Sequence, residues 1–428
     1  MIAAAGILAL SRGYTFYFDE WDFIQSAPDW SWTSYLEPHN EHPVMLPRLI
    51  YAALLFTFGL HTYLPYMVVL MALHGASAVL VFELVRRRAG DLVGVACAAM
   101  LLVLGAGWEN LLWAFQIAFV GSVACGLGML LALEGPRTRP RLAVAAVLLA
   151  TSLMFSGIGV FFGVAAAVRL WLDRPRRREL LWFAPVGVAF AAWYLAFGHG
   201  GAPTVPPPTA ANVFLLPAYV GWGLGGSAAG IIGVTGYPAL AVLVLAAGAI
   251  GYTWWRHHRP DPLAVAVATG LLTFYVLTGL TRAQLGFDQS ASGRYVYVGA
   301  VFWLILLADA ARLLPWSGTW RPALAAVVFL ACFNSSVLLF AYAAGKTAVM
   351  QREIADLQAL AVERSDRCLN PTGAVDPLVM PHVTNPALYY RAVDRFGDPT
   401  DGLPITDRPD FDRARSNLTR SGCTPTYT

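Results

Sequence analysis

A short acidic run near the start of the sequence holds the residues best suited to chemistry. The run "YFDEWDF", residues 17–23, places Asp19, Glu20 and Asp22 within four positions and among aromatic side chains. A carboxylate beside a membrane gains basicity from the loss of water and from neighbouring acids. A general base that takes a proton from a hydroxyl group needs such basicity. The sequence therefore predicts Asp19, Glu20 and Asp22 as catalytic carboxylates.

A plainer interpretation of this run stays open. A short loop on the outer side of a membrane avoids basic residues, and aromatic residues form a belt at the membrane surface. The loop holds six acids before its first base, Arg48. A lack of bases does not by itself account for three acids in four positions, and ionisable groups at membrane depth are usually functional.

The same loop continues with a polar cluster in "EPHNEHPVMLPR". We expect its side chains to donate and accept hydrogen bonds with a sugar or with acceptor hydroxyls; they are His39, Asn40, Glu41 and His42. A solvated turn is the plain alternative. A second alternative is a divalent metal shared with Asp19 or Asp22, because imidazole and carboxylate are metal ligands. No His-x-x-x-His spacing supports a zinc site, so no metal ligand is assigned.

Two arginines bracket a loop that should face outward, "TRAQLGFDQSASGRYVY". These are Arg282 and Arg294, with Tyr295 directly behind the second. The planar guanidinium group suits phosphate oxygens, and outer loops normally lack arginine. The sequence predicts a phosphate site here, to which Arg48 would add a third cation. The alternative is a pair of arginines whose charged ends reach the membrane surface from helix ends.

The stretch "GWENLLWAFQ" combines tryptophans with polar residues. Trp108 and Glu109 would suit the apolar face and the hydroxyls of a sugar ring, although tryptophans at a helix end are also typical of an interfacial belt. Glu109 and Gln116 are seven residues apart, so we expect them on one face of a single helix.

The elements that must position these residues are membrane helices. The chain has 428 residues, of which 57% are hydrophobic and only 13% are charged, and its mean hydropathy is +0.57. Soluble domains reach about 25% charged residues. The net charge is +3, and only one of the 29 basic residues, Lys346, is lysine. This preference for arginine indicates a GC-rich, bacterial gene. The class is an all-α polytopic membrane protein.

Arginine-rich loops predict the orientation, because short cytoplasmic loops carry the excess of basic residues. Clusters follow residues 85, 136, 173, 255 and 311, whereas the intervening loops are nearly free of bases. We expect about eleven spans, with the N-terminus in the cytoplasm and the C-terminus outside: 2–16, 62–85, 92–107, 111–133, 142–155, 158–172, 180–198, 237–255, 263–281, 295–313 and 322–343. We expect the short first span to be partly embedded or to lack upstream residues, and the pair 142–155 and 158–172 has a re-entrant alternative.

Two apolar segments do not fit as spans. Residues 46–60 would invert every later loop if they crossed the membrane, so we expect a helix on the outer surface. Residues 212–232 follow the linker "GAPTVPPPT" and are rich in glycine, which indicates an interfacial or re-entrant segment. Residues 1–344 then form the transmembrane domain, with its first outer loop at 17–61.

Residues 345–428 change in character. They hold 10 of the 29 bases and 11 of the 26 acids, so we expect a small extracytoplasmic domain that opens with a helix near 346–364. Its only cysteines, Cys368 and Cys423, would lie in an oxidising compartment, which favours a disulfide between them.

The apolar first helix, the adjacent acids of the first outer loop and the surface helix before the second span resemble the GT-C glycosyltransferases. These membrane enzymes use lipid-phosphate-linked sugars, and an acid in the first outer loop activates the acceptor. The resemblance carries this role to Asp19 and Glu20, and less directly to Asp22. An arginine and a tyrosine at the start of a late span, here Arg294 and Tyr295, also resemble members of the group.

The resemblance implies an inverting transfer from a polyprenyl-phosphate-linked sugar to a glycan or a lipid-linked acceptor of the cell envelope, at the outer face of the plasma membrane. No nucleotide-binding loop, nucleophile elbow or zinc spacing occurs, so the leaving phosphate must supply the driving force. We expect no nucleic-acid partner and no obligatory cofactor, with a divalent metal left open. A transporter or lipid flippase is the alternative, although transporters place ionisable groups near mid-membrane. A non-catalytic envelope scaffold is the third.

Overall fold

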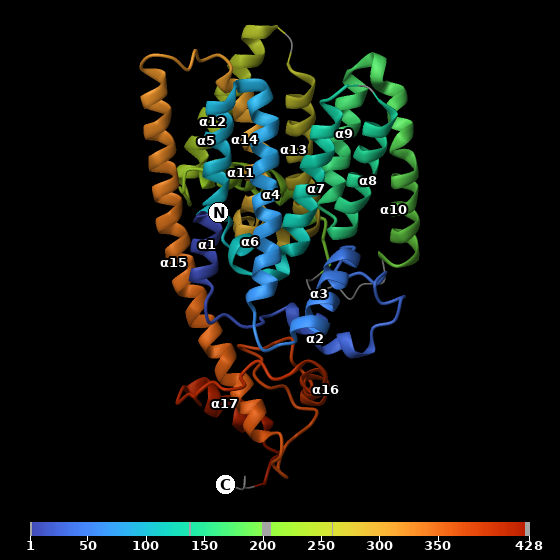
Figure 1. The fold of residues 1–428 in the computed structure, drawn as a ribbon, viewed down its shortest axis with the longest axis vertical. Coiled ribbons are helices and arrows are strands. Elements are labelled where there is room, and N and C mark those ends of the chain that lie inside the picture. Colours follow the sequence, from blue (N-terminus) through green and yellow to red (C-terminus); the bar gives the residue numbers. More distant parts are fainter. Residues whose placement is uncertain (1, 137, 199–206, 259, 424–428) are drawn as a thin grey trace.

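The computed structural model describes residues 2–136, 138–198, 207–258 and 260–423, and within these ranges the chain folds into helices with no strand. Arg137 and Arg259 of the arginine clusters, and residues 201–206 of the proline-rich linker, lie outside the described residues. The long helices stand side by side in one bundle, and the C-terminal segment covers one end of it (Figure 1).

The first part of the chain supplies ten helices. They are α1 Ile2–Leu10, α2 Glu20–Ser26, α3 Met45–Phe58, α4 Leu64–Ala89, α5 Asp91–Leu102, α6 Glu109–Leu112, α7 Ile117–Leu133, α8 Arg139–Phe155, α9 Gly159–Leu172 and α10 Ala184–Ala196. The remainder supplies α11 Ala211–Gly230, α12 Pro238–His257, α13 Pro262–Arg282, α14 Gly293–Ala311, α15 Trp320–Glu363, α16 Pro386–Phe396 and α17 Pro409–Leu418.

Six of these helices are long and apolar enough to cross a membrane, and counting one bent helix pair raises the number to seven. The chain is therefore built as a multi-pass membrane protein, and the expected all-helical membrane class is confirmed. Several further helices are apolar but shorter, including α3, α5 and α9. The count of eleven spans stays a prediction.

Ion pairs gather the arginine-rich loops at one end of the bundle. Arg88 at the end of α4 binds both Glu134, which follows α7, and Asp261, which precedes α13, at 2.7 Å each. Arg169 of α9 reaches Glu134 at 2.8 Å. The first loop and the C-terminal segment lie at the opposite end (Figure 1). The alternation of arginine-rich and arginine-poor loops thus corresponds to two ends of one bundle.

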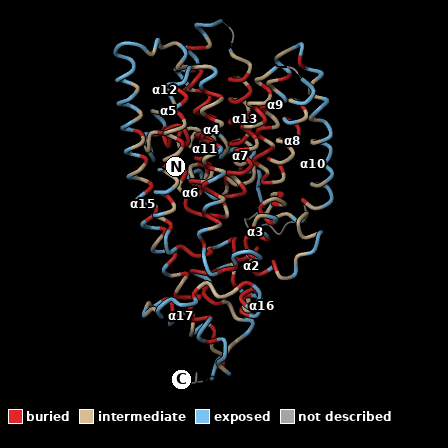
Figure 2. Tube along the Cα trace, in the orientation of Figure 1, coloured by how far each residue is buried: buried red, intermediate tan, exposed pale blue. Residues whose placement is uncertain are grey.

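The core of the bundle lies around α7, α13 and α14, whereas α10, α12 and the apolar part of α15 leave most side chains exposed (Figure 2). The glycine-rich segment folds as α11 and packs against α12, α13 and α14. Gly223 permits this packing, because a Cβ atom there would collide with the ring of Tyr275. The second half of α11 is therefore packed into the bundle, and the interfacial or re-entrant character of this segment stays a prediction.

The expected single helix across residues 111–133 is wrong. Trp113 takes an extended conformation, with φ −142° and ψ 113°, so a short α6 and a 3-10 turn at Ala114–Gln116 precede α7. Glu109 and Gln116 consequently do not share a face of one helix. The break turns the indole of Trp113 toward the first loop, where its Nε1 donates to Glu20 Oε2 at 3.2 Å.

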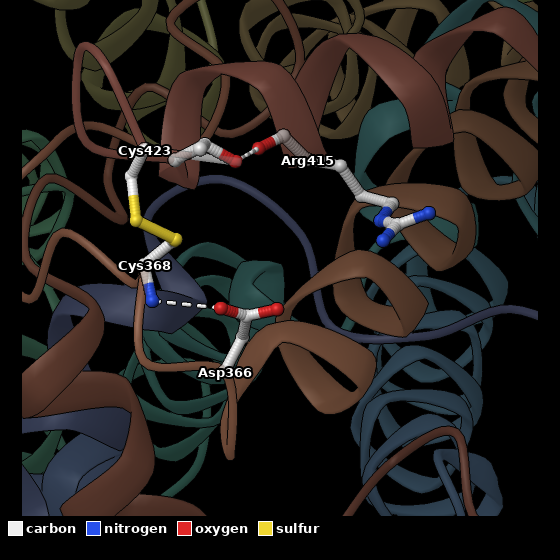
Figure 3. Close-up of a disulfide and its surroundings, with 5 residues drawn as sticks. Asp366, Cys368, Arg415 and Cys423 are labelled. Carbon is white, nitrogen blue, oxygen red and sulfur yellow. Dashed lines mark hydrogen bonds between the residues drawn. A yellow bond between two sulfur atoms is a disulfide. The ribbon is translucent and has the colours of Figure 1, made fainter. Parts of the chain in front are cut away.

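The last span and the C-terminal segment are one continuous structure. α15 runs for 44 residues, so the boundary expected at 344–345 falls inside this helix. The segment after it folds back on the helix through α17 and on the first loop through α16. Cys368 and Cys423 form a disulfide with a Cα–Cα distance of 5.6 Å (Figure 3). Beside it, Asp366 accepts a hydrogen bond from the Cys368 backbone N–H.

Candidate functional site

Two carboxylates and two imidazoles meet at the start of α2. Asp19 directly precedes this helix and Asp22 lies three positions later, so both project from one face. Asp19 Oδ1 lies 3.5 Å from His39 Nε2 and 3.7 Å from His382 Nε2. Asp22 Oδ2 lies 2.9 Å from His382 Nδ1. Asp19 is 7% exposed, whereas the Asp22 side chain is 38% exposed, so the cluster is shielded at Asp19 and open to water at Asp22.

A strained backbone precedes Asp19. Phe18 has φ +54°, a left-handed conformation that is unfavourable for a bulky residue. Such strain persists only where the surrounding structure imposes it, and it gathers at functional sites. Here it lets Phe18 line a cavity while Asp19 turns toward the two imidazoles.

His382 is the member of this cluster that the sequence reasoning missed. It comes from the C-terminal segment, 360 residues after Asp22. Its backbone carbonyl accepts a hydrogen bond from Gln25 of α2 at 2.9 Å. Burial lowers the pKa of His382, but the hydrogen bond to Asp22 and the charges of Asp22 and Asp19 outweigh it, so the net pKa is raised. It is the only histidine in residues 345–428, and that was the one available signal.

Glu20 does not join the cluster. Its side chain is fully buried. Its oxygens accept hydrogen bonds from the Tyr51 and Tyr63 hydroxyls, the Trp113 indole and the backbone N–H of Tyr17. Burial raises the pKa of Glu20 to about 7, against the opposing effect of these donors. A carboxylate enclosed in this way holds α2 against its neighbours and has no free face for a substrate.

Arg48 likewise has a structural role, because its side chain is hydrogen-bonded within the first loop. Its expected contact with a phosphate is therefore not supported. Its Nη1 donates to the carbonyl oxygens of Ser34 and Glu37. The guanidinium group lies 5.4 Å from the centre of the Phe23 ring, and the residue is 8% exposed. Arg48 therefore holds the first loop onto α3.

The remaining residues of the polar cluster are divided between two neighbourhoods. His39 faces Asp19, whereas exposed Glu41 approaches Arg282 at 3.8 Å. Asn40 lies between them with φ +53°. His42 is withdrawn from water, and Arg282, His39 and Arg294 add positive charge, so its pKa falls to about 3. His42 is therefore neutral and its ring can accept a hydrogen bond.

A cavity of about 350 Å³ is lined by Phe18, the residue directly before Asp19, whereas Asp19 and Asp22 themselves do not line it. The cationic side chains of Arg294 and Lys346 line this cavity, as does Glu109. Most of its remaining wall is aromatic and is formed by Tyr17, Phe18, Trp108, Trp113 and Tyr342. Arg294 Nε lies 3.6 Å from Glu109 Oε2, and the charge of Asp19 acts on Arg294. The structure thus places Trp108, Glu109 and Arg294 around one space, whose lining also includes Phe18, the neighbour of Asp19.

Tyr295 and Arg282 stand apart from this cavity. Tyr295 is 4% exposed and packs edge-on against Phe274, with its ring 5.7 Å from the Arg294 guanidinium. It lies behind Arg294 and does not line the cavity, so its expected part in the donor-phosphate site stays a prediction. Arg282 does not line the cavity, although its charge and that of Arg294 both act on His42.

The acidic cluster has the residue types of a divalent-cation site. Ligand atoms of Asp19, Asp22 and His39 all lie within 4.8 Å of one another. His39 Nε2 is buried and has no hydrogen-bond partner among the described residues. Carboxylate oxygen and imidazole nitrogen suit divalent transition metals, so these residues fit such an ion.

Comparisons with models of known protein families and with curated protein sequences found no match. Among solved structures, the chain is similar to ArnT from Cupriavidus metallidurans bound to undecaprenyl phosphate. The TM-score is 0.59 at 12% identity, over 97% of this chain and 86% of that one. The apo state of the same protein gives a TM-score of 0.56 at 13% identity, over 94% and 88%. The expected resemblance to the GT-C glycosyltransferases is thus confirmed at the level of the fold.

Proposed function

We propose that this protein transfers a sugar from a polyprenyl-phosphate donor to a hydroxyl group of a cell-envelope acceptor. The observation that carries the proposal is that Asp19 directly follows Phe18, which lines the cavity that holds Arg294, and that the charge of Asp19 acts on Arg294. A carboxylate next to a cation-bearing, aromatic-walled space is what glycosyl transfer from a lipid phosphate requires. The ArnT-like fold over nearly the whole chain supports the same reaction class.

In the proposed reaction Asp19 is the base. The acceptor hydroxyl gives its proton to the Asp19 carboxylate, and its oxygen attacks the anomeric carbon as the bond to the phosphate oxygen breaks. The leaving phosphate takes up the negative charge, which the Arg294 guanidinium neutralises at fixed geometry. A single displacement of this kind inverts the anomeric configuration. Asp22 and the two imidazoles orient Asp19, and Glu20 anchors the helix that carries the acids.

We propose that the site faces outward from the plasma membrane. The arginine-rich end of the bundle would lie in the cytoplasm with the N-terminus, and the C-terminal segment would lie outside with its disulfide. Eleven spans satisfy this arrangement. The proposed acceptor, a glycan or a lipid-linked molecule, is the class that the resemblance to the GT-C glycosyltransferases implies.

The transporter and scaffold alternatives explain less. A transporter would place its ionisable site near mid-membrane, whereas the acidic cluster lies at the end of the bundle covered by the C-terminal segment (Figure 1). A scaffold needs neither a shielded carboxylate at 7% exposure nor an adjacent cavity.

We also propose that a divalent cation binds this cluster, with Asp19, Asp22 and His39 as its ligands. When bound it would screen the two carboxylates and polarise a coordinated hydroxyl. Elemental analysis of the purified protein, with and without dialysis against a chelator, tests the proposal. A stoichiometric metal that His39→Gln removes would support it, and metal-free protein with full transfer activity would overturn it.

The experiment that tests the function is Asp19→Asn, with Asp29→Asn as the matched control. Asp29 belongs to the same loop, but its pair with Arg391 is exposed, and exposed pairs contribute little. Release of polyprenyl phosphate from polyprenyl-phosphate-linked hexoses and pentoses would be followed in the presence of envelope extract. We expect a loss of about 10²–10⁴-fold for Asp19→Asn and none for Asp29→Asn. Near-normal transfer by both Asp19→Asn and Asp22→Asn would overturn the proposal.

A further inference from the structure

The single lysine of the chain points into the cavity lined by Phe18 and Arg294. Lys346 lies in the middle of α15, and its side chain lines the same space as Arg294. The residue is 6% exposed. An ammonium group is costly to bury unless it is paired, so this position needs an explanation.

The surroundings of the ammonium group offer aromatic faces in place of acceptors. Lys346 Nζ lies 3.2 Å from the centre of the Tyr17 ring and 5.5 Å from that of Trp113. Within the described residues, no hydrogen bond or ion pair of Lys346 is found, while an ammonium group carries three donors. Glu20, Glu109 and Glu353 act on it only through their charges. The donors of Lys346 are therefore free to meet a ligand.

Arg294 supplies the second cation of the same cavity from a different helix, α14. Glu109 neutralises only part of its charge, at 3.6 Å, and the Arg294 side chain keeps 31% exposure. Two cations from two helices and an aromatic wall make a site for an anion with an attached sugar. A cavity of about 350 Å³ accommodates a phosphate and part of a sugar ring.

We propose that Lys346 and Arg294 together bind the phosphate of the lipid-linked donor. The inference rests on the proposed function. The sequence predicted a phosphate site formed by Arg294 and Arg282, and here Lys346 takes the place of Arg282. Arg282 faces Glu41 and does not line the cavity. A compact ammonium and a planar guanidinium group differ in how they hold phosphate oxygens, so Lys346 acts as a point charge beside the fork of Arg294.

The competing explanation is structural: Lys346 would only balance the charges of Glu20 and Glu353. If this explanation is right, substitutions at Lys346 lower thermal stability without changing the affinity for a lipid phosphate. If Lys346 binds phosphate, the same substitutions lower the affinity for a lipid phosphate even in variants that keep the stability of the wild type.

The test measures binding of farnesyl phosphate to the purified full-length protein, with farnesol as the neutral control. Trp108 and Trp113 line the cavity, so intrinsic fluorescence reports occupancy. We expect Lys346→Gln and Lys346→Met to weaken binding of farnesyl phosphate by about 10- to 100-fold, because a charge-assisted contact is lost. Lys346→Arg should stay within a few-fold of the wild type, and Arg282→Gln should bind normally. Weakened binding in Arg282→Gln with normal binding in both neutral Lys346 variants would overturn the pairing.

A second measurement does not depend on the folding of the variants. Because the chain has one lysine, reductive methylation followed by mass spectrometry reports on Lys346 without ambiguity. Farnesyl phosphate should slow the modification and farnesol should not; equal rates in both would overturn the proposal. Normal binding in the Lys346 variants together with inactive Asp19→Asn would reject this subsite and leave the transferase function standing. A wild type that binds no lipid phosphate would reject both.

Discussion

At the scale of single residues, His382 interacts differently with the two carboxylates of the acidic cluster, Asp19 and Asp22. One ring nitrogen is hydrogen-bonded to Asp22, and the other faces Asp19 at 3.7 Å. Asp22 is thereby engaged while Asp19 keeps an oxygen toward both imidazoles. In the proposed reaction Asp19 would therefore be the base, and His382 and Asp22 would position it.

Replacing His382 by glutamine should therefore lower the transfer rate while the affinity for the donor is kept. Misplacement of a catalytic group by about 1 Å costs on the order of 10²-fold, so we expect a loss of up to that size in kcat with little change in KM. Steady-state kinetics of release of polyprenyl phosphate would measure it. His257→Gln, at an exposed site at the end of α12, is the control. An unchanged kcat in His382→Gln would remove this residue from the site.

Glu20 should make the stability of the fold depend on pH. Its pKa in the folded chain is about 7, raised by burial from an ordinary value of 4.5. Between these values only the folded state holds the proton, so its contribution is complete below the ordinary pKa and is lost as the pH rises through about 7.

The matching measurement compares thermal unfolding of the wild type and Glu20→Gln in detergent between pH 5 and pH 8. The variant has no titrating group at this position, so the wild type should lose stability relative to it as the pH rises. A difference in Tm that is constant over this range would contradict the prediction.

At the scale of elements, the end of α3 joins the first loop to the C-terminal segment. Gly59 ends α3 with φ +63° and ψ −152°, a region that essentially only glycine adopts. A Cβ atom there would collide with the backbone carbonyl of Phe396, which instead accepts a hydrogen bond from Leu60 N–H at 2.8 Å. α16 is thereby seated against the first loop that carries the acids.

Gly59→Ala should loosen this junction and destabilise the protein by more than 1 kcal/mol, since strain and collision act together, each costing roughly 1–3 kcal/mol. Protease sensitivity of the C-terminal segment would rise, and the thermal unfolding temperature would fall. Gly75→Ala is the control, because a Cβ atom at that position in α4 meets nothing within 4 Å. Equal stability of the two variants would show that the junction tolerates a side chain.

The disulfide secures the same segment. It closes a separation of 55 residues that includes His382 and α16, and the chain-entropy model assigns such a loop ~4 kcal/mol. The double variant Cys368→Ser/Cys423→Ser should unfold at a lower temperature and transfer sugar more slowly, because His382 would be held less firmly. Cys332→Ser is the control. Free thiols at both cysteines in the native protein, seen by mass spectrometry of unreduced peptides, would disprove the disulfide.

At the scale of the whole molecule, the two ends of the bundle differ in charge and composition. Arg88, Arg169, Glu134 and Asp261 join the loops at one end, while the acidic cluster and the C-terminal segment occupy the other. We expect a cytoplasm-dependent fluorescent reporter fused after Thr428 to stay dark, and the same reporter fused after Arg88 in a truncated chain to be fluorescent. Fluorescence of the full-length fusion would reverse the proposed orientation.

The amino-acid sequence by itself predicted the helical membrane class, the two classes of loop and the candidate carboxylates Asp19, Glu20 and Asp22, of which Asp19 and Asp22 lie in one cluster. These features are local: about 20 apolar residues cross a bilayer, and arginine marks short loops whatever the helices do. The pairing of Cys368 with Cys423 was also accessible, because no other cysteine lies in residues 345–428.

Only the tertiary structure decided which polar residues share a site. Glu20 and Arg48 resemble their neighbours in the sequence. In the folded chain, however, Glu20 is enclosed among tyrosines and Arg48 donates hydrogen bonds to loop carbonyl oxygens. His382 lies more than 300 residues after Asp22 and contacts it, and Lys346 lies more than 300 residues after Tyr17 and contacts its ring. Both contacts form because α15 continues past the bundle and the chain then folds back. Such contacts depend on the path of the whole chain and leave no periodic trace in the sequence, which is the physical reason that local patterns could not predict them.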